Sequence, residues 1–360
     1  MSCILFSICY LFILFGSNLS YLVGACYLVP VAMFNIVLTL GFYKKHNRVY
    51  KRIHDSYILE YIWIDGPGGN LRSKYRTAYP NFDSMDDSTG NSVTVEDWSC
   101  DGEIALVPVA HFSNPFFEPG RAFLVLCETR RDNGTPTDTN FRCDAAKVFD
   151  RHRNLDAWFG LEQEYAVFIQ HGAPTAAVTS LAEKHYEYCF QAGLKISGIG
   201  AADAESRWEF KIGPCSAIGA ADELWVARYI LHKLSEEFGV CISFNGGGLC
   251  TNFSTTETRE SRNRKQDGLK CIYKYIDRLS KNHGEHIRVY GDNSQRLTGA
   301  CDYHTLRIAA GGGAATIRIP KSVLKAGCGY LEDRRPASDA DPYQVTAAIF
   351  KTACLDYILV

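Results

Sequence analysis

The chain has 360 residues, 46% hydrophobic and 22% charged, which is ordinary for a globular protein of one or two domains. Its formal net charge of −2 and its scattered basic residues exclude a strongly basic nucleic-acid-binding surface. No two of the 14 cysteines stand in a C-x-x-C spacing, so the sequence predicts reduced and mostly buried thiols, with no zinc site or disulfide framework.

The first 50 residues form an apolar leader that ends in a basic cluster. Residues 1–16 are almost wholly apolar, and residues 21–43 carry no charge and exceed the roughly 20 residues that span a bilayer. Basic residues gather at 44–52, and such clusters tend to remain on the cytoplasmic side. The pattern favours a membrane anchor, a hairpin or a single span within residues 1–43, with the rest of the chain in the cytoplasm.

Two other interpretations of this leader remain open. Residues 1–16 would serve as the hydrophobic region of a cleaved signal peptide, although the usual charged segment before that region is absent. Alternatively, residues 1–50 come from an erroneous gene model and do not belong to the protein.

Residues 55–135 predict a small β-rich domain. "YILEYIWIDGPGGNLRSKYRT" (57–77) has the pattern strand, glycine turn, strand, and residues 103–112 and 122–129 are further strand candidates. A polar stretch with Gly and Pro, residues 130–140, predicts a linker. A second domain then follows over residues 141–360.

Helical patterns appear in this second domain. Ser180 and Glu183 form a capping box before a helix that ends at Gly193. Residues 222–238 place apolar side chains at helical spacing and are followed by a glycine, and residues 268–282 predict another helix.

The stretch "WFGLEQEYAVF" (158–168) sets two carboxylates among apolar neighbours. Residues two apart in a strand share a face, so Glu162 and Glu164 point the same way. Two like charges on a half-buried face repel, and something positive is expected between them. A solvated strand face is the simpler alternative.

Four later stretches also carry polar chemistry. In "RWEFKIGP", Glu209 and Lys211 share one strand face. The glycines of "NGGGLCTNFST" (245–255) allow the backbone to approach a ligand closely, although such a run is often only a turn. Arg318 lies on the strand "ATIRIPK", and "YLEDRRP" (330–336) combines acidic and basic side chains, which a salt-bridged surface turn would also explain.

Together these stretches resemble the glutamine synthetase family in its eukaryotic form. The matching stretches, in chain order, are "YIWIDGPGGNLRSKYRT", "NFDSMDDSTG", "WFGLEQEYAVF", "RWEFKIGP", "WVARYILHKLSEEFGV", "TNFST", "RLTG", "IRIP" and "GYLEDRRPASDADPYQVTAAI". The resemblance covers about residues 57–355 and leaves the leader out. It implies an α+β fold, with an N-terminal β-grasp domain followed by an α/β catalytic domain on a curved antiparallel sheet.

The resemblance implies an ATP-dependent ligase that joins ammonia to glutamate through a γ-glutamyl phosphate, with Mg²⁺ or Mn²⁺ at the site. Hard cations prefer carboxylate oxygen, which would explain the acidic strand. The implied metal ligands are Glu162 and Glu332 at the ion next to the γ-phosphate, and Glu164 and Glu209 at the ion near glutamate.

The remaining implied roles fall on residues of the same motifs. ATP contacts are implied for Glu162, Glu209, Asn252, Ser254, Arg318 and Tyr330. Glutamate contacts are implied for Asn245, Gly246, Arg296 and Arg334, and catalytic roles for Arg318, Arg334, Asp83 and Asp302. Family members form stacked rings in which each site lies between two subunits, so Asp83 would come from the neighbour. The implied partners are glutamate, ammonia, ATP and further copies of this chain or of a related synthetase.

The sequence departs from the family pattern inside the site. Ala202 and Cys250 stand where the family has a glutamate and a histidine metal ligand, and thiolate is a poor ligand for magnesium. Gly313 replaces an arginine that serves phosphoryl transfer, and the glutamate that closes the substrate site is at best the shorter Asp302. The "NFDSMDDSTG" loop is longer than in the family, and a "GPYYCGVG" region is missing.

Three hypotheses follow from these matches and departures. The chain is an active glutamate–ammonia ligase with substitute ligands, or a catalytically impaired relative that binds nucleotide or co-assembles with active subunits. The third hypothesis is an unexpressed or wrongly assembled gene product. Because the removal of one electrostatic contributor costs about 10²–10³ in rate, the departures bear directly on the first.

Overall fold

The computed structural model describes residues 56–66, 69–79, 95–100, 104–169, 176–202, 207–260, 267–291, 308–310 and 315–355. All of the elements described below belong to one compact unit, formed by residues 57–78 and 94–360. The leader, residues 1–50, lies outside the described residues, and so does the anchor predicted within it. Within the described residues, no helix is long and apolar enough to span a membrane.

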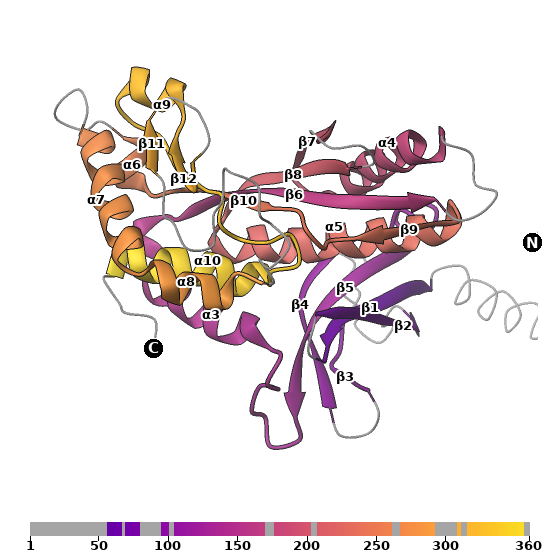
Figure 1. Cartoon of the computed structure of the whole chain (residues 1–360). Coiled ribbons are helices and arrows are strands. Elements are labelled where there is room, and N and C mark those ends of the chain that lie inside the picture. The colour runs from indigo at the N-terminus through magenta and orange to yellow at the C-terminus, as the bar shows by residue number, and fades with distance from the viewer. Residues whose placement is uncertain are drawn as a thin grey trace, which may run out of the picture. The chain divides into compact units, whose positions relative to one another are not determined.

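The first sheet contains five strands in the order β2-β1-β5-β4-β3 (Figure 1). The strands are β1 (Tyr57–Asp65), β2 (Asn70–Ala78), β3 (Trp98–Cys100), β4 (Ile104–Ser113) and β5 (Ala122–Arg131). The central pair, β1 and β5, is parallel, and the other neighbours are antiparallel. The expected strand–turn–strand of residues 57–77 is therefore confirmed, whereas β3 was not predicted because three residues are too few to show a period.

A fully buried carboxylate ties this sheet to a later helix. Glu60 on β1 has no exposed surface and accepts hydrogen bonds from Lys233 Nζ at 2.9 and 3.0 Å. Asn114 Nδ2 donates to it at 2.6 Å, and the Tyr229 hydroxyl donates as well. A buried charge is tolerated only when it is paired and hydrogen-bonded, so these contacts make Lys233 part of the fold of the first sheet.

The larger sheet contains eight strands in the order β11-β12-β13-β10-β6-β8-β7, with β9 also paired to β6. The strands are β6 (Trp158–Ile169), β7 (Ile196–Ala201), β8 (Arg207–Ser216), β9 (Val240–Ser243), β10 (Leu249–Ser254), β11 (Ile308–Ala310), β12 (Ile317–Ile319) and β13 (Leu331–Asp333). The sheet is curved and belongs to a mixed α/β fold. One correction applies to the expected antiparallel sheet: β11 and β12 are parallel.

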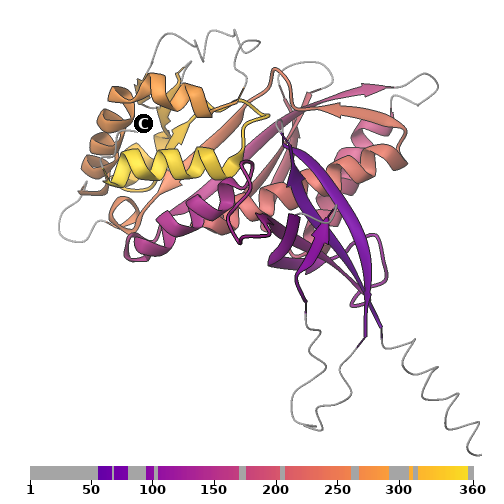
Figure 2. The ribbon, with the colours of Figure 1, turned by 90° about the horizontal axis from the view of Figure 1, so that it is seen from below.

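The helices cover the larger sheet and pack against one another. They are α3 (Phe141–Arg151), α4 (Ala176–Gln191), α5 (Ala217–Glu237), α6 (Thr256–Arg259), α7 (Asp267–Lys281), α8 (His283–Val289), α9 (Lys321–Ala326) and α10 (Pro342–Phe350), with a 3₁₀ turn at Arg153–Leu155 and a π-helical turn at Lys351–Leu355. Helix α5 runs along one face of the sheet, against β6, β8 and β9 (Figure 1). Helix α10 lies beside α3 and α8 (Figure 2).

The three helix predictions agree with helices α4, α5 and α7, but two of the starts differ. Helix α7 matches residues 268–282 within one residue, and α5 ends where the glycine stop was expected but begins at Ala217, before the predicted stretch. Helix α4 begins at Ala176, so Ser180 lies inside the helix and is not its cap. The buried stripe of α4 continues upstream, because Ala177 lies one turn before Leu181 and both are buried.

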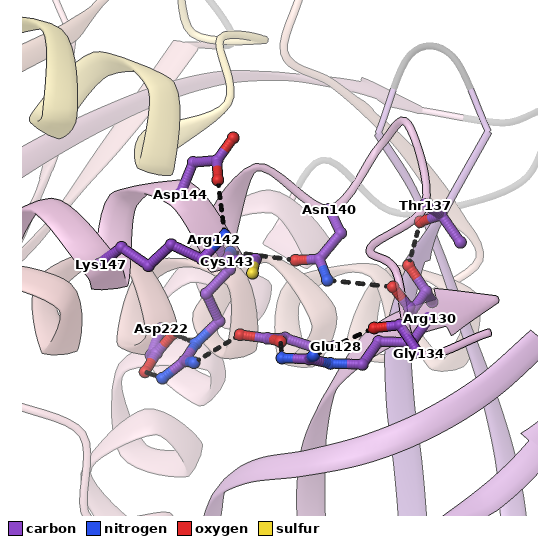
Figure 3. A network of polar contacts seen from close by, with 11 residues as sticks. Glu128, Arg130, Gly134, Thr137, Asn140, Arg142, Cys143, Asp144, Lys147 and Asp222 are labelled. Atoms are coloured by element: carbon purple, nitrogen blue, oxygen red, sulfur yellow. Dashed lines mark hydrogen bonds and ion pairs between the residues drawn. The ribbon is translucent and has the colours of Figure 1, made fainter. Parts of the chain in front are cut away.

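An arginine clamp holds α3, α5 and β5 together (Figure 3). Arg142 Nε and Nη2 donate to the two carboxylate oxygens of Asp222 at 2.8 and 2.9 Å, and Nη1 donates to Glu128 Oε1 at 3.0 Å. Asn140, at the start of α3, accepts from the Cys143 N–H at 3.2 Å and so caps the helix. The bidentate pair fixes both the distance and the orientation of the two helices.

Candidate active site

Strands β6 and β8 bring the predicted carboxylates to one face of the larger sheet. In the antiparallel register, Glu162 lies opposite Lys211, and Glu164 lies opposite Glu209. Gln163, between the two glutamates on β6, is fully buried on the other face and accepts from Arg228. The alternation predicted for "LEQEY" is therefore confirmed. The positive charge expected between the two glutamates lies beside Glu162, where it is Lys211, whereas Glu164 accepts a backbone hydrogen bond.

Lys211 bridges two carboxylates from different strands. Its Nζ lies 3.2 Å from Glu162 Oε2 and 3.2 Å from Glu209 Oε1. Burial lowers the pKa of Lys211, but the charges of Glu162 and Glu209 outweigh burial, and the pKa lies above its ordinary value. The ammonium is therefore fully charged at neutral pH. Glu162 Oε1 also accepts from Asn252 Nδ2 at 3.0 Å.

Glu332 on β13 is compensated by arginines. Its side chain is 3% exposed, Arg318 Nε lies 2.5 Å from Oε2, and Arg334 Nε lies 3.7 Å from Oε1. Burial raises the pKa of Glu332, with Arg318 lowering it and nearby Glu162 raising it further, and the net direction is upward. Arg318 and Glu332 lie opposite each other in the β12–β13 register.

The fourth predicted carboxylate, Glu164, binds backbone instead of a cation. The Gly248 N–H donates to Glu164 Oε2 at 2.9 Å, and the Glu164 N–H donates to the Gly248 carbonyl at 3.0 Å. Gly247 packs against the same side chain, because a Cβ there would lie 3.0 Å from Glu164 Cβ and 2.9 Å from Arg207 Nη1. The glycine run thus approaches a protein carboxylate closely in this structure.

A cavity of about 490 Å³ opens beside this cluster. Among the predicted site residues, Glu162, Asn252, Ser254 and Tyr330 line it, and Lys211 lines it as well. Four of the six residues expected to contact ATP therefore share one hollow. Its volume falls within the roughly 300–1,000 Å³ range of small-molecule pockets. A larger cavity, about 1180 Å³, includes none of the predicted site residues in its lining.

Arg259 and Trp158 form a platform at the same cavity. The Arg259 guanidinium carbon lies 4.2 Å from the centre of the Trp158 ring, and Arg259 donates to Ser254 Oγ at 3.0 Å and to Asp156 Oδ2 at 2.5 Å. Burial lowers the pKa of Arg259 somewhat, but the group stays charged. A flat cation over an aromatic ring, next to a hydroxyl, suits a planar base with a polar edge.

Asn245 and Gly246, expected to contact glutamate, lie in the turn after β9. Asn245 borders a different cavity of about 590 Å³ and does not line the cavity beside Glu162. Its carbonyl accepts from Arg207 Nη2 at 3.2 Å, and Gly246 has a φ of 72°, which favours glycine. The structure therefore does not bring these two residues together with the predicted nucleotide residues.

Several predicted site residues lie outside the described part of the chain. These are Asp83, Arg296 and Asp302, together with Gly313 among the departures. Ala202 is described and follows the end of β7, and its N–H donates to the Arg207 carbonyl at 2.9 Å. Cys250 is 7% exposed, lies opposite Glu162 in the β10–β6 register and is not in a disulfide.

The described side chains do not fit a divalent ion as they are arranged. Within the described ranges, no group of three or more His, Cys, Asp and Glu side chains is placed to hold a metal ion. Glu162 and Glu209 share the Lys211 ammonium, Glu332 is paired with Arg318, and Glu164 accepts from the backbone. Cys250 would add a soft thiolate, which suits magnesium poorly.

Sequence reasoning missed two residues of this site. Lys211 had a usable signal, since it was predicted on the same strand face as Glu209, but its partner across the sheet depends on the β6–β8 register. Arg259 had no such signal, because a single arginine after "NFSTTET" resembles any residue of a short helix. Its role follows from the packing of α6 against β10 and the chain entering β6.

Known proteins are similar to this chain over most of its length. No family model matches it. The chain is 43% identical over 336 residues to a glutamine synthetase of Eremothecium gossypii, covering 82% of this chain and 89% of the relative. It is 42% identical over 336 residues to a glutamine synthetase of Saccharomyces cerevisiae, with the same coverage. It is 40% identical over 347 residues to a glutamine synthetase of Emericella nidulans, covering 83% and 93%.

Proposed function

The chain belongs to the glutamine synthetase family, and on that premise we propose that it is a glutamate–ammonia ligase that makes glutamine at the expense of ATP. The observation that carries this proposal is the cavity beside Glu162. Residues from four separate stretches, Glu162, Lys211, Asn252 and Tyr330, converge on it. The cavity is of ligand size and carries both charge signs, which suits a nucleotide with its phosphates.

The reaction we propose proceeds in two displacements. A γ-carboxylate oxygen of glutamate attacks the γ-phosphorus of ATP, the bond from that phosphorus to the bridging oxygen breaks, and ADP leaves. Ammonia then attacks the acyl carbon of the γ-glutamyl phosphate, phosphate leaves, and the nitrogen loses a proton. Little covalent work falls to the protein, so its contribution is positioning and charge stabilisation.

Three cations of the chain would supply that stabilisation. Lys211 pairs with Glu162 at the cavity, and Arg318 and Arg334 lie near Glu332. Each would bind a non-bridging phosphoryl oxygen, because an ammonium or guanidinium donates charge-assisted hydrogen bonds to phosphate. We assign the catalytic roles to Arg318 and Arg334, with Asp83 and Asp302 as further members of the site, and the glutamate contacts to Asn245, Gly246, Arg296 and Arg334.

The family generally uses divalent metal ions together with ATP. For this chain the expected ligands of Mg²⁺ or Mn²⁺ are Glu162, Glu164, Glu209 and Glu332. An ion there would neutralise phosphate charge. Since Lys211 and Arg318 occupy three of these carboxylates, no step of the proposed reaction depends on an ion.

The assembly and location belong to the same proposal. We propose a homo-oligomeric ring, or co-assembly with a related synthetase, with the catalytic domain in the cytoplasm. For the first sheet we propose the β-grasp arrangement, which its strand order and its central parallel pair support. The domain boundaries at 55–135 and 141–360, and a membrane anchor within residues 1–43, stay predictions.

One observation favours a second candidate function. Ala202 offers no ligand atom, and Cys250 offers only a buried sulfur opposite Glu162. Both stand where the family pattern has metal ligands. A chain that binds nucleotide in the cavity but turns over slowly would then act by co-assembling with active subunits.

The test is a γ-glutamyl hydroxamate assay on the purified full chain with ATP, glutamate and hydroxylamine. We expect product from the unchanged chain and a decrease of about 10²–10³-fold in Glu162→Ala, which removes one charged contributor to the site. Glu187→Ala, at an exposed glutamate of α4, is the matched control and should keep full activity. A folded chain whose product equals that of Glu162→Ala would favour the second candidate.

A further inference from the structure

We propose that the Lys211 ammonium takes the place of a divalent cation between Glu162 and Glu209, so that a side chain supplies charge that the family draws from a metal ion. The inference rests on the proposed function for its meaning, because it names the cation of that same site. It concerns one position only, the space between the side chains of Glu162 on β6 and Glu209 on β8. Its physical basis is the geometry of three side chains.

The first step is the position of the ammonium. Lys211 lies directly across the strand pair from Glu162, and Glu209 lies two residues before it on the same face of β8. Nζ is 3.2 Å from one oxygen of each carboxylate. It thus bridges Glu162, expected at the ion next to the γ-phosphate, and Glu209, expected at the ion near glutamate. A simple surface ion pair would engage one carboxylate.

The second step is what a divalent ion would meet there. Such an ion binds carboxylate oxygens at about 2.0–2.6 Å. An ion on the same oxygens would therefore lie within roughly 6 Å of the lysine nitrogen, and two positive charges at that separation repel. The ion would have to displace the ammonium. The neighbouring positions Ala202 and Cys250 supply no oxygen to offset that cost.

The third step is what the ammonium offers a ligand. A lysine ammonium has three N–H donors. In the part of the chain that the structure describes, its contacts are to Glu162 and Glu209, which leaves one N–H toward the 490 Å³ cavity that Lys211 lines. Lysine binds phosphate as a compact point charge. A phosphate oxygen entering the cavity would therefore meet a charge that is already in place.

The decisive experiment is a titration of Mn²⁺ into the purified full chain, with free Mn²⁺ followed by its electron paramagnetic resonance signal. We expect weak binding by the unchanged chain and binding at least about tenfold tighter by Lys211→Gln, because a repelling charge is gone. The control is Lys147→Gln, an exposed lysine of α3 paired with Asp144 (Figure 3), which should bind Mn²⁺ like the unchanged chain. Equal binding by the unchanged chain and Lys211→Gln would overturn the inference.

A second measurement needs no variant and decides the matter if Lys211→Gln does not fold. Binding of a non-hydrolysable ATP analogue is compared in EDTA and in excess Mg²⁺. We expect dissociation constants that agree within about threefold, since the ammonium is present in both conditions. Binding that requires Mg²⁺ would overturn the inference while leaving the proposed function intact. No nucleotide binding in either condition would count against the proposed function, and the Mn²⁺ titration would then judge the inference alone.

Discussion

Two adjacent acidic residues on β13 serve opposite faces of the sheet. Glu332 lies near Glu162 and pairs with Arg318. Asp333 faces the core and pairs with Arg335, and the two side chains are 0% and 1% exposed. Burial would raise the pKa of Asp333, but Arg335 outweighs burial, and the pKa lies below its ordinary value. Neighbouring residues of one motif therefore divide into a site residue and a structural residue.

This division predicts that Asp333→Asn destabilises the protein strongly. The amide keeps the shape of the side chain but leaves the Arg335 guanidinium buried without a counter-charge. Breaking a buried pair costs about 3–5 kcal/mol of unfolding free energy. Urea unfolding followed by fluorescence measures the loss. Glu332→Gln is the matched comparison, and it should affect nucleotide binding more than stability. A loss under about 1 kcal/mol for Asp333→Asn would contradict the assignment.

Sequence reasoning could assign Glu162 and Glu164 to a shared face because strand alternation depends only on neighbouring residues. It could not pair Lys211 with Glu162, because that contact joins residues 49 positions apart and depends on strand register. It also could not separate the tasks of Glu332 and Asp333. Both are acidic, and only packing shows which one faces the core.

At the level of elements, the arginine clamp joins α3, α5 and β5. Arg142 is 14% exposed, and its partners Glu128 and Asp222 are 5% and 7% exposed. Tyr343 on α10 donates to the same Asp222 at 2.6 Å. The loss of this guanidinium removes the cation that pairs with Asp222, whereas Glu128 keeps its ion pair with Arg130 at 2.9 Å.

Arg142→Ala is therefore predicted to lower the unfolding free energy by about 3–5 kcal/mol. Thermal and urea unfolding measure this loss. The control is Arg153→Ala, whose arginine is 78% exposed and paired with an exposed Asp150. That variant should change stability by less than about 1 kcal/mol. Similar losses of unfolding free energy in the two variants would show that the Arg142 ion pairs stabilise the fold no more than an exposed ion pair does.

Element types were easier to predict than element ends. Helix α5 was predicted because its apolar residues recur over many turns, and its glycine stop is local. The start of α4 was wrong because a serine followed by a glutamate three residues later also occurs inside helices. The expectation of an antiparallel sheet was wrong for β11 and β12, which are parallel. Strand direction depends on the connection between strands and not on the strands themselves.

At the level of the whole molecule, buried titratable groups set the pH dependence of stability. Burial lowers the pKa of His185 to about 4 and, helped by Arg335, that of His286 to about 3. Unfolded histidine has a pKa of about 6.5, so below that pH the unfolded state binds two protons that the folded state does not. Burial raises the pKa of Asp341 to about 6, and it raises the pKa of Glu332 as well. These carboxyls bind protons more readily in the folded state, so their effect on stability opposes that of the histidines.

The effect of the two histidines on the unfolding free energy is larger than that of the carboxyls. The unfolding free energy is therefore predicted to fall by about 2 kcal/mol between pH 7 and pH 5. Urea unfolding at several pH values measures the slope. In His185→Gln the slope should flatten, whatever the absolute stability of that variant. His111→Gln, at an exposed position on β4, should keep the slope of the unchanged chain. A flat profile in the unchanged chain would contradict the neutral, buried state of the two histidines.

The β-rich character of the first sheet and the mixed character of the remainder were predictable from local patterns. The strand orders were not, because β1 pairs with β5 and β6 pairs with β10 across long separations in sequence. The cavity and its lining follow from those orders. The prediction of which polar residues belong to one site rests on the resemblance of motifs and not on local physics.

The burial of Glu60 has a consequence for how the chain is made. Lys233, which neutralises this carboxylate, lies 173 residues later. At about 5–20 residues per second, the ribosome needs roughly 10–35 seconds to deliver that lysine after Glu60 has been synthesised. During that interval the α5 side chains that bond Glu60, Tyr229 and Lys233, are missing, so the sheet cannot yet bury this carboxylate with its native partners. Its five strands therefore reach their final packing only after α5 has left the exit tunnel.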